Sequence, residues 1–237
     1  PAFLLESADL DLAARCIAFG KFLNAGQTCV AVDYCMCPRG KERELRLKIL
    51  KYVREFFGDN PIISRNLGKI ISENDYRRLV ETLESENVKF KRDDRRLKIE
   101  PTVVITDLNS PLMRREIFGP ILPIIPYDYK EKALDYIKSQ KTPLAFYIFG
   151  SEKEATEIAG RMKFGGASIN DTMSHMVGSL PFGGMGESGI GAYHGEYTFK
   201  TFVHEKSVLV KKKWPDFKLR YPGKSIAELL KKLFRIK

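Results

Sequence analysis

Residues 121–170 have the sequence ILPIIPYDYKEKALDYIKSQKTPLAFYIFGSEKEATEIAGRMKFGGASIN, in which short apolar runs alternate with amphipathic segments of helical length. The pattern predicts strands over residues 121–125, 144–149 and 167–170, and helices over residues 130–139 and 152–162. Strands that are joined by helices usually lie parallel in one sheet. The stretch therefore predicts an α/β fold with an open, twisted, mainly parallel sheet flanked by helices.

The same alternation extends towards the N-terminus. Residues 9–23 predict a helix whose apolar face is made of Leu12, Cys16, Phe19 and Leu23. A turn-forming stretch follows it, and we expect a buried strand next. The further predicted elements are a strand over 30–36, helices over 41–57 and from Ser72, a polar hairpin near Asp93 and Asp94, and a strand over 103–106.

The C-terminal residues differ from the rest. We expect one domain over residues 1–200 and an appendage over residues 201–237, which consists of a short strand arm at 207–210 and a helical tail. The tail carries an apolar stripe on a basic helix from Ser225 to Lys237. This helix could lie on an anionic membrane surface, but we favour packing of its stripe against the domain.

Composition and charge exclude several classes of protein. The chain has 237 residues, 43% of them hydrophobic, which is enough for a sizeable core. It shows no leader sequence and its apolar runs are strand-sized, so we expect a cytoplasmic protein. The net charge is +10, but residues 211–237 hold ten Lys or Arg against two acids. Because the body is nearly neutral, nucleic acid is not an expected partner.

Four cysteines bear on possible chemistry. Cys35 and Cys37 lack the two-residue gap of a usual zinc or redox pair, and we expect them to be buried in a strand. No metal site is predicted. Cys29 follows Gly26-Gln27-Thr28 where a helix gives way to a strand, so its thiol could face a cleft and attack a carbonyl carbon. On these grounds alone a buried packing role for Cys29 remains the alternative.

Three segments carry a resemblance that favours the nucleophile. They are Asn24-Ala25-Gly26-Gln27-Thr28-Cys29, Glu116-Ile117-Phe118-Gly119-Pro120 and, from Leu180 to Gly189, LPFGGMGESG. In this order and spacing they resemble the aldehyde dehydrogenase superfamily, and the resemblance covers essentially the whole chain. Residues 143–149 and 191–195 resemble its class 3 branch, which acts on fatty and aromatic aldehydes.

The resemblance implies an NAD- or NADP-dependent oxidoreductase. Cys29 would attack the aldehyde to form a thiohemiacetal, which passes hydride to the nicotinamide and leaves a thioester for water to hydrolyse. Glu116 would accept hydrogen bonds from the nicotinamide ribose, and Phe118 would pack beside the nicotinamide. Phe182 would line the meeting point of substrate and nicotinamide, with Leu144 as a second candidate for that wall or as plain core.

One further match is rejected as a dinucleotide motif. Residues 184–189, GMGESG, fit the pattern G-x-G-x-x-G, but the pattern requires a preceding apolar strand. Here Pro181 precedes it, and proline cannot donate to a strand ladder. We expect a glycine loop beside the active site instead.

The resemblance also implies missing parts. In this family the dinucleotide-binding domain lies N-terminal to the matched stretch, and the general-base glutamate belongs to a run whose final proline corresponds to Pro1. We therefore expect the chain to be the C-terminal catalytic half of a longer enzyme, inactive alone, with the cofactor domain supplied in cis or in trans. A local departure is Arg114-Arg115, where the family often carries acids or glutamine.

Two other hypotheses stay open. The chain could be a non-catalytic half-protein that acts as an interaction or oligomerisation module, because the family uses the 207–210 region to join another subunit's sheet. A CoA-acylating relative is also compatible with the residues present. By resemblance to the class 3 branch we expect a homodimer and an aldehyde substrate.

Overall fold

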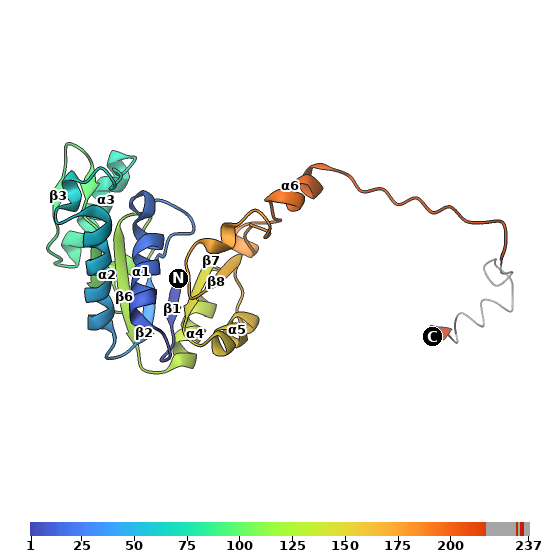
Figure 1. Ribbon diagram of the computed structural model, residues 1–237, viewed down its shortest axis with the longest axis horizontal. Helices are drawn as coiled ribbons and strands as arrows, with labels where there is room; N and C mark the ends of the chain where they lie inside the picture. Colours follow the sequence, from blue (N-terminus) through green and yellow to red (C-terminus); the bar gives the residue numbers. More distant parts are fainter. Residues whose placement is uncertain (217–230, 232, 235–237) are drawn as a thin grey trace. The chain divides into compact units, whose positions relative to one another are not determined.

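The computed structural model describes residues 1–216, 231, 233 and 234. The chain divides into two units, Pro1–Phe202 and Val203–Lys237. The first unit contains a six-stranded sheet in the order β5-β6-β2-β1-β7-β8, in which every neighbouring pair is parallel (Figure 1). The predicted α/β fold with a parallel sheet is therefore confirmed.

Elements of the first unit follow one another with short connections. The strands are β1 (Ala2–Leu4), β2 (Cys35–Pro38), β5 (Thr102–Ile105), β6 (Ile121–Tyr127), β7 (Ala145–Phe149) and β8 (Gly166–Ile169), with the hairpin β3 (Arg92–Asp93) and β4 (Lys98–Ile99) apart from the sheet. The helices are α1 (Leu10–Phe22), α2 (Glu42–Phe57), α3 (Glu73–Ser85), α4 (Lys130–Ser139), α5 (Glu152–Arg161) and α6 (Gly195–Phe202).

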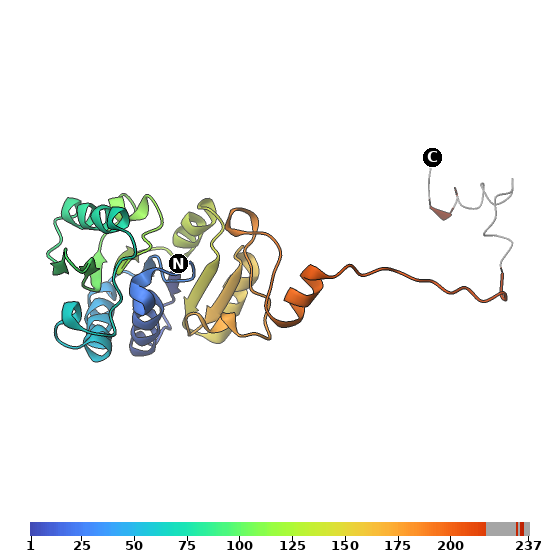
Figure 2. The same cartoon turned by 90° about the horizontal axis from the view of Figure 1, so that it is seen from above.

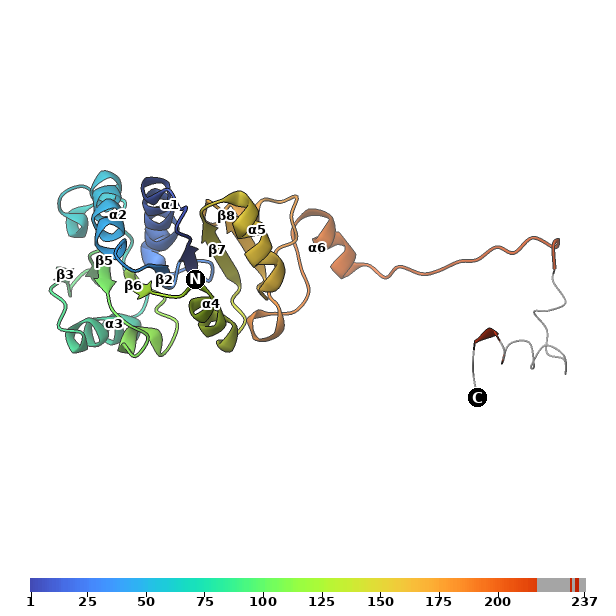
Figure 3. The same cartoon turned by 90° about the horizontal axis from the view of Figure 1, so that it is seen from below.

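Alternation along the strands builds a core on each face of the sheet. In β7, Tyr147 and Phe149 join one buried cluster, while Phe146 and Ile148 join another. The first cluster is covered by α1 and α2, and the second by α4 and α5. Figure 3 shows α1 and α2 on one side of the sheet and α3 and α4 on the other. Burial on both faces explains why these strands are almost wholly apolar.

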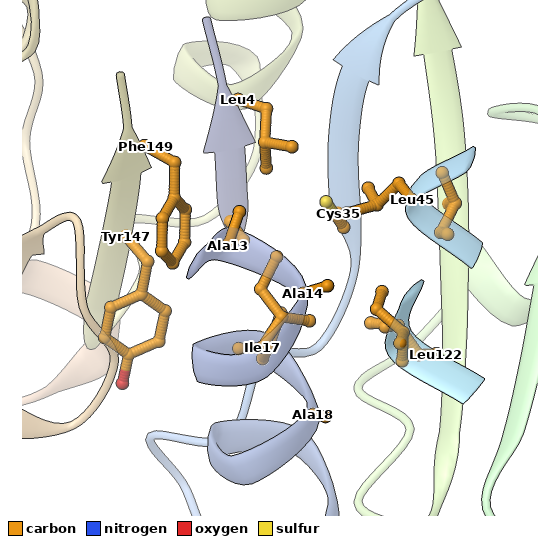
Figure 4. Close-up of a cluster of buried hydrophobic side chains, with 14 of the residues drawn as sticks. Leu4, Ala13, Ala14, Ile17, Ala18, Cys35, Leu45, Leu122, Tyr147 and Phe149 are labelled. Atoms are coloured by element: carbon orange, nitrogen blue, oxygen red, sulfur yellow. The ribbon is translucent and has the colours of Figure 1, made fainter. Parts of the chain in front are cut away.

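Helix α1 corrects one sequence expectation. Its buried residues include Ala13, Ala14, Ile17 and Ala18, which Figure 4 shows among the side chains of the sheet. The predicted face is not the buried one, because Phe19 is 48% exposed and Leu23 is 43% exposed. Small residues let the helix backbone approach the sheet and α2 closely.

The strand predicted over residues 30–36 is also wrong in its bounds, since β2 begins at Cys35. Residues 28–31 form turns and bends instead. Val30 and Val32 are nevertheless buried, so their apolar character reflects burial of a loop. The short strand β1, which lies at the centre of the sheet between β2 and β7, was not predicted.

The second unit has neither helix nor strand over residues 203–216. The predicted strand at 207–210 has no paired strand among the described residues, and Leu209 is 88% exposed. The predicted tail helix lies outside the described residues except for Lys231, Leu233 and Phe234. Figure 2 gives a second view of the chain. Within the described residues, no helix combines the length and apolarity needed to cross a membrane.

Candidate active site

A cavity of about 490 Å³ lies where several loops enter the strands of the sheet. Its lining residues include Cys29, Glu116 and Leu144. These residues lie in the segments that run into β2, β6 and β7 respectively. Because the strands are parallel, all three segments meet at the amino ends of the strands. Ligand sites in open α/β sheets usually lie at the carboxyl ends, so the fold class alone does not locate this cavity.

The loop that carries Cys29 starts with an unusual backbone. Asn24, Ala25 and Gly26 have φ angles of 51°, 53° and 74°, so three consecutive residues are left-handed. This run turns the chain sharply after α1. The side-chain amide of Gln27 then anchors the loop, because it donates to the Lys69 carbonyl at 2.9 Å and accepts from the Ile71 amide at 2.9 Å.

The position of Cys29 is set by its neighbours, while its own side chain stays accessible. Cys29 is exposed, in contrast to the buried Cys35 and Cys37. The next residue, Val30, is buried, and its carbonyl accepts a hydrogen bond of 2.6 Å from the Tyr147 hydroxyl. An anchored backbone on either side of an exposed thiol is an arrangement suited to a nucleophile.

The loop that carries Glu116 is held through its neighbour Ile117. The Ile117 amide donates to the Asp33 carboxylate at 2.9 Å, and its carbonyl accepts from the Arg78 guanidinium at 2.9 Å. The next residue, Phe118, has a φ of 50° and is 39% exposed. A left-handed phenylalanine is rare and is kept only where the surroundings impose it.

The two loops touch through their glycines. A Cβ atom on Gly26 would lie 2.3 Å from the carbonyl oxygen of Gly119, far inside contact distance. Only glycine therefore permits this approach, and its left-handed φ favours glycine as well. The Gly26–Gly119 contact brings the Cys29 loop and the Glu116 loop together at one cavity.

Several charged groups act on Glu116 and on one another. Lys21, at the end of α1, is fully buried. Burial lowers the pKa of Lys21 to about 8, against the opposing influence of Asp33 and Glu116. Burial raises the pKa of the Glu116 carboxyl, Asp33 raises it further, and Lys21 and Arg78 oppose the rise. Glu116 is therefore subject to the charges of Asp33, Lys21 and Arg78 together.

Contrary to the expectation, the glycine-containing segment from Leu180 to Gly189 does not bring Phe182 to the cavity. Phe182 is buried and pairs its backbone with Tyr193, and its ring stacks on His194 at 5.3 Å. It does not line the cavity, whereas Ser188 of the glycine loop does. The loop is therefore beside this cavity.

The structure thus brings Cys29, Glu116 and Leu144 to one cavity and leaves Phe118 and Phe182 outside its lining. Arg114 and Arg115 also line it. Lys21, Asp33 and Arg78 were missed, although a lysine on a helix face otherwise made of apolar residues was a usable indication. Within the described part of the chain, no three His, Cys, Asp or Glu side chains are grouped so as to hold a metal ion.

Comparison with known proteins gives concordant matches. The model of the "Aldehyde dehydrogenase family" matches residues 1–208. "Aldehyde dehydrogenase family 3 member A2" of Rattus norvegicus is 40% identical over 232 residues, covering 95% of this chain and 48% of that protein.

Two solved structures match as well. The substrate-bound state of Staphylococcus aureus AldH has a TM-score of 0.89 and 38% identity, covering 99% of this chain and 53% of the other. Mycobacterium tuberculosis aldehyde dehydrogenase complexed with NAD+ has a TM-score of 0.77 and 28% identity, covering 91% and 47%. The chain spans about half the length of the relatives named here.

Proposed function

Because this chain belongs to the aldehyde dehydrogenase family, we propose that it is the nucleophile-bearing half of an enzyme that oxidises aldehydes to carboxylic acids with NAD or NADP. The observation that carries the proposal is the exposed Cys29 thiol, which shares one cavity with Glu116. A thiol on an anchored loop and a partly exposed carboxylate are the two groups that the reaction requires of this half.

Cys29 would act as the nucleophile. Its thiolate adds to the aldehyde carbon, and the backbone amide of Cys29 can donate to the resulting oxyanion. Bound nicotinamide supplies a two-electron acceptor for the hydride of that carbon. After hydride loss the sulfur holds an acyl group as a thioester, and water cleaves it to release the acid and free Cys29. Resemblance assigns the general base to sequence upstream of Pro1.

The residues present fit the nicotinamide end of a cofactor. The Glu116 carboxylate accepts no hydrogen bond from any described residue, so both of its oxygens are available to a ribose diol. Phe118 leaves part of its ring exposed next to it. Leu144 supplies an apolar wall to the cavity. The corresponding role for Phe182 rests on the resemblance alone.

Replacement of the nucleophile tests the proposal. In the protein at its full natural length, we expect Cys29→Ala to lower aldehyde oxidation on the order of a thousandfold or more, because no other group forms the thioester. Cofactor binding, measured by quenching of protein fluorescence, should be unchanged. Cys16→Ala is the matched control, since Cys16 is half-buried outside the cavity, and it should keep most of the activity. Full turnover by Cys29→Ala would refute the assignment.

The isolated chain should be inactive. Residues 1–237 contain Cys29 and Glu116 but, by resemblance, neither the general base nor most of the cofactor site. We expect no steady formation of NADH or NADPH from purified chain and aldehyde, followed by absorbance. Continuous formation that Cys29→Ala abolishes would contradict this expectation.

A second candidate function is that of an interaction module. The observation in its favour is the run Val208-Leu209-Val210, whose side chains are 78%, 88% and 85% exposed. Such a run offers a strand for addition to another sheet, including that of a second copy. A module would bind no nicotinamide cofactor even when mixed with an N-terminal half, whereas the enzyme would recover binding.

A further inference from the structure

Lys21 is a buried charge that the proposed mechanism does not use. Its side chain is fully buried, and its ammonium nitrogen has no hydrogen-bond partner among the described residues. A buried ammonium without neighbouring negative charge is strongly unfavourable. The negative charges that act on it are Asp33 and Glu116. Lys21 is therefore tied electrostatically to the cavity.

Asp33 connects this charge to the backbone of the Glu116 loop. Its carboxylate accepts the Ile117 amide hydrogen at 2.9 Å, across 84 residues of sequence. From α3, Arg78 donates to the Ile117 carbonyl at 2.9 Å and to Asp75 at 3.3 Å. Both polar groups of residue 117 are thus held by side chains. Ile117 itself is buried, so this point of the loop is fixed.

Neighbouring negative charges repel each other, and a nearby cation offsets that repulsion. Asp33 and Glu116 influence each other in this way, and the charge of the buried Lys21 attracts both of them without a direct ion pair. A charged Asp33 also holds the Ile117 amide more strongly than a neutral acid would.

We propose that Lys21 and Asp33 are positioning residues for Glu116. The buried positive charge of Lys21 offsets the repulsion between the two carboxylates, and Asp33 fixes the peptide that directly follows Glu116. The result is a charged Glu116 at a fixed place, ready to accept two hydrogen bonds. That Glu116 binds the ribose diol of NAD or NADP rests on the proposed function.

The experiment uses the full-length protein with Cys29→Ala, which removes turnover and leaves binding to be measured. The variants are Lys21→Met, Asp33→Asn and the two combined. Lys51→Met is the control, because Lys51 is an exposed lysine on α2 that pairs with Glu55. The readouts are the dissociation constants for NAD and NADP and, without cofactor, the amide hydrogen exchange of a peptide covering residues 114–119.

We expect Lys21→Met to weaken binding about tenfold, because the repulsion between Asp33 and Glu116 is no longer offset, and to speed exchange over residues 114–119. Adding Asp33→Asn should restore part of the cofactor affinity and part of the slow amide exchange. The asparagine oxygen still accepts the Ile117 amide hydrogen, and the negative charge of Asp33, which Lys21 no longer offsets, is gone. Lys51→Met should change neither. A lysine that merely packs would give a combined variant at least as weak as Lys21→Met, and that result would overturn the proposal.

Asp33 provides a second test if Lys21→Met does not fold. Asp33→Ala should speed exchange at Ile117 more than Asp33→Asn does, because only the alanine variant loses the acceptor. Equal exchange in the two would overturn the role of Asp33. If the unsubstituted protein binds neither NAD nor NADP, the proposed function fails, while the exchange comparison still decides the positioning role.

Discussion

At the scale of single residues, Lys21 links folding to protonation. Its pKa is about 8 in the folded chain, below the ordinary value of 10.5, because burial disfavours the charged form. Between these two values the unfolded chain binds more protons than the folded chain does. Raising the pH through this window therefore favours folding, and the contribution of Lys21 to stability is lowest below about pH 8.

We predict that the free energy of unfolding of the unsubstituted protein, minus that of Lys21→Met, rises from pH 7.5 to pH 10.5 by on the order of 3 kcal/mol. Denaturant titrations at each pH measure both values. Subtracting the variant removes the contributions of the buried tyrosines and cysteines, which titrate in the same range in both proteins. A difference that stays flat across this window would contradict the assignment of a lowered pKa to Lys21.

At the scale of elements, the site depends on contact between two loops. The Cys29 loop follows α1 and the Glu116 loop precedes β6. Gly26 and Gly119 permit their contact, since a Cβ on Gly26 would meet a backbone carbonyl that cannot turn aside. Neither loop's local sequence contains this information, because the limiting atom belongs to the other loop.

We predict that Gly26→Ala destabilises the protein by about 2–4 kcal/mol, the sum of left-handed strain and overpacking. Gly191→Ala is the matched control, because Gly191 has a φ of 73°, close to the 74° of Gly26, with nothing within 4 Å of its would-be Cβ. That variant should lose only about 1 kcal/mol from the backbone strain. Chemical denaturation measures both losses, and equal values would mean that the contact with Gly119 relaxes without cost.

At the scale of the whole molecule, the second unit contains an exposed apolar run that pairs with no strand among the described residues. Val208, Leu209 and Val210 are all exposed, and exposed apolar segments of this kind are favourable for strand addition. The homodimer that we propose by resemblance to the class 3 branch would bury them. In strand pairing, successive amides point to opposite sides.

Single proline substitutions test this proposal. Proline lacks the amide hydrogen, so only one of Val208→Pro and Leu209→Pro should remove a hydrogen bond to the partner strand. We predict that one variant shifts the full-length protein towards monomer, by about tenfold in dissociation constant or more, and that the other does so much less. Sedimentation velocity over a concentration series measures the shift. Equal behaviour of the two variants would argue against strand addition.

Local sequence determined most of the elements. The predicted and observed bounds of α4 agree, and α2 and α3 bury the apolar residues that the helical period placed on one face, including Leu45 and Leu79. The three ordered motifs also indicated the family and selected Cys29 and Glu116. Period, capping and turn preferences are properties of neighbouring residues, so the sequence contains them directly.

Tertiary structure alone decided which residues surround the cavity. It placed the three-residue strand β1 at the centre of the sheet, turned the small-residue face of α1 inward, and set the cavity at the amino ends of the strands. It also joined Asp33 to Ile117 across 84 residues. The physical reason is that burial, close packing and charge pairing depend on distance in space, and local sequence patterns do not contain the distance between remote segments.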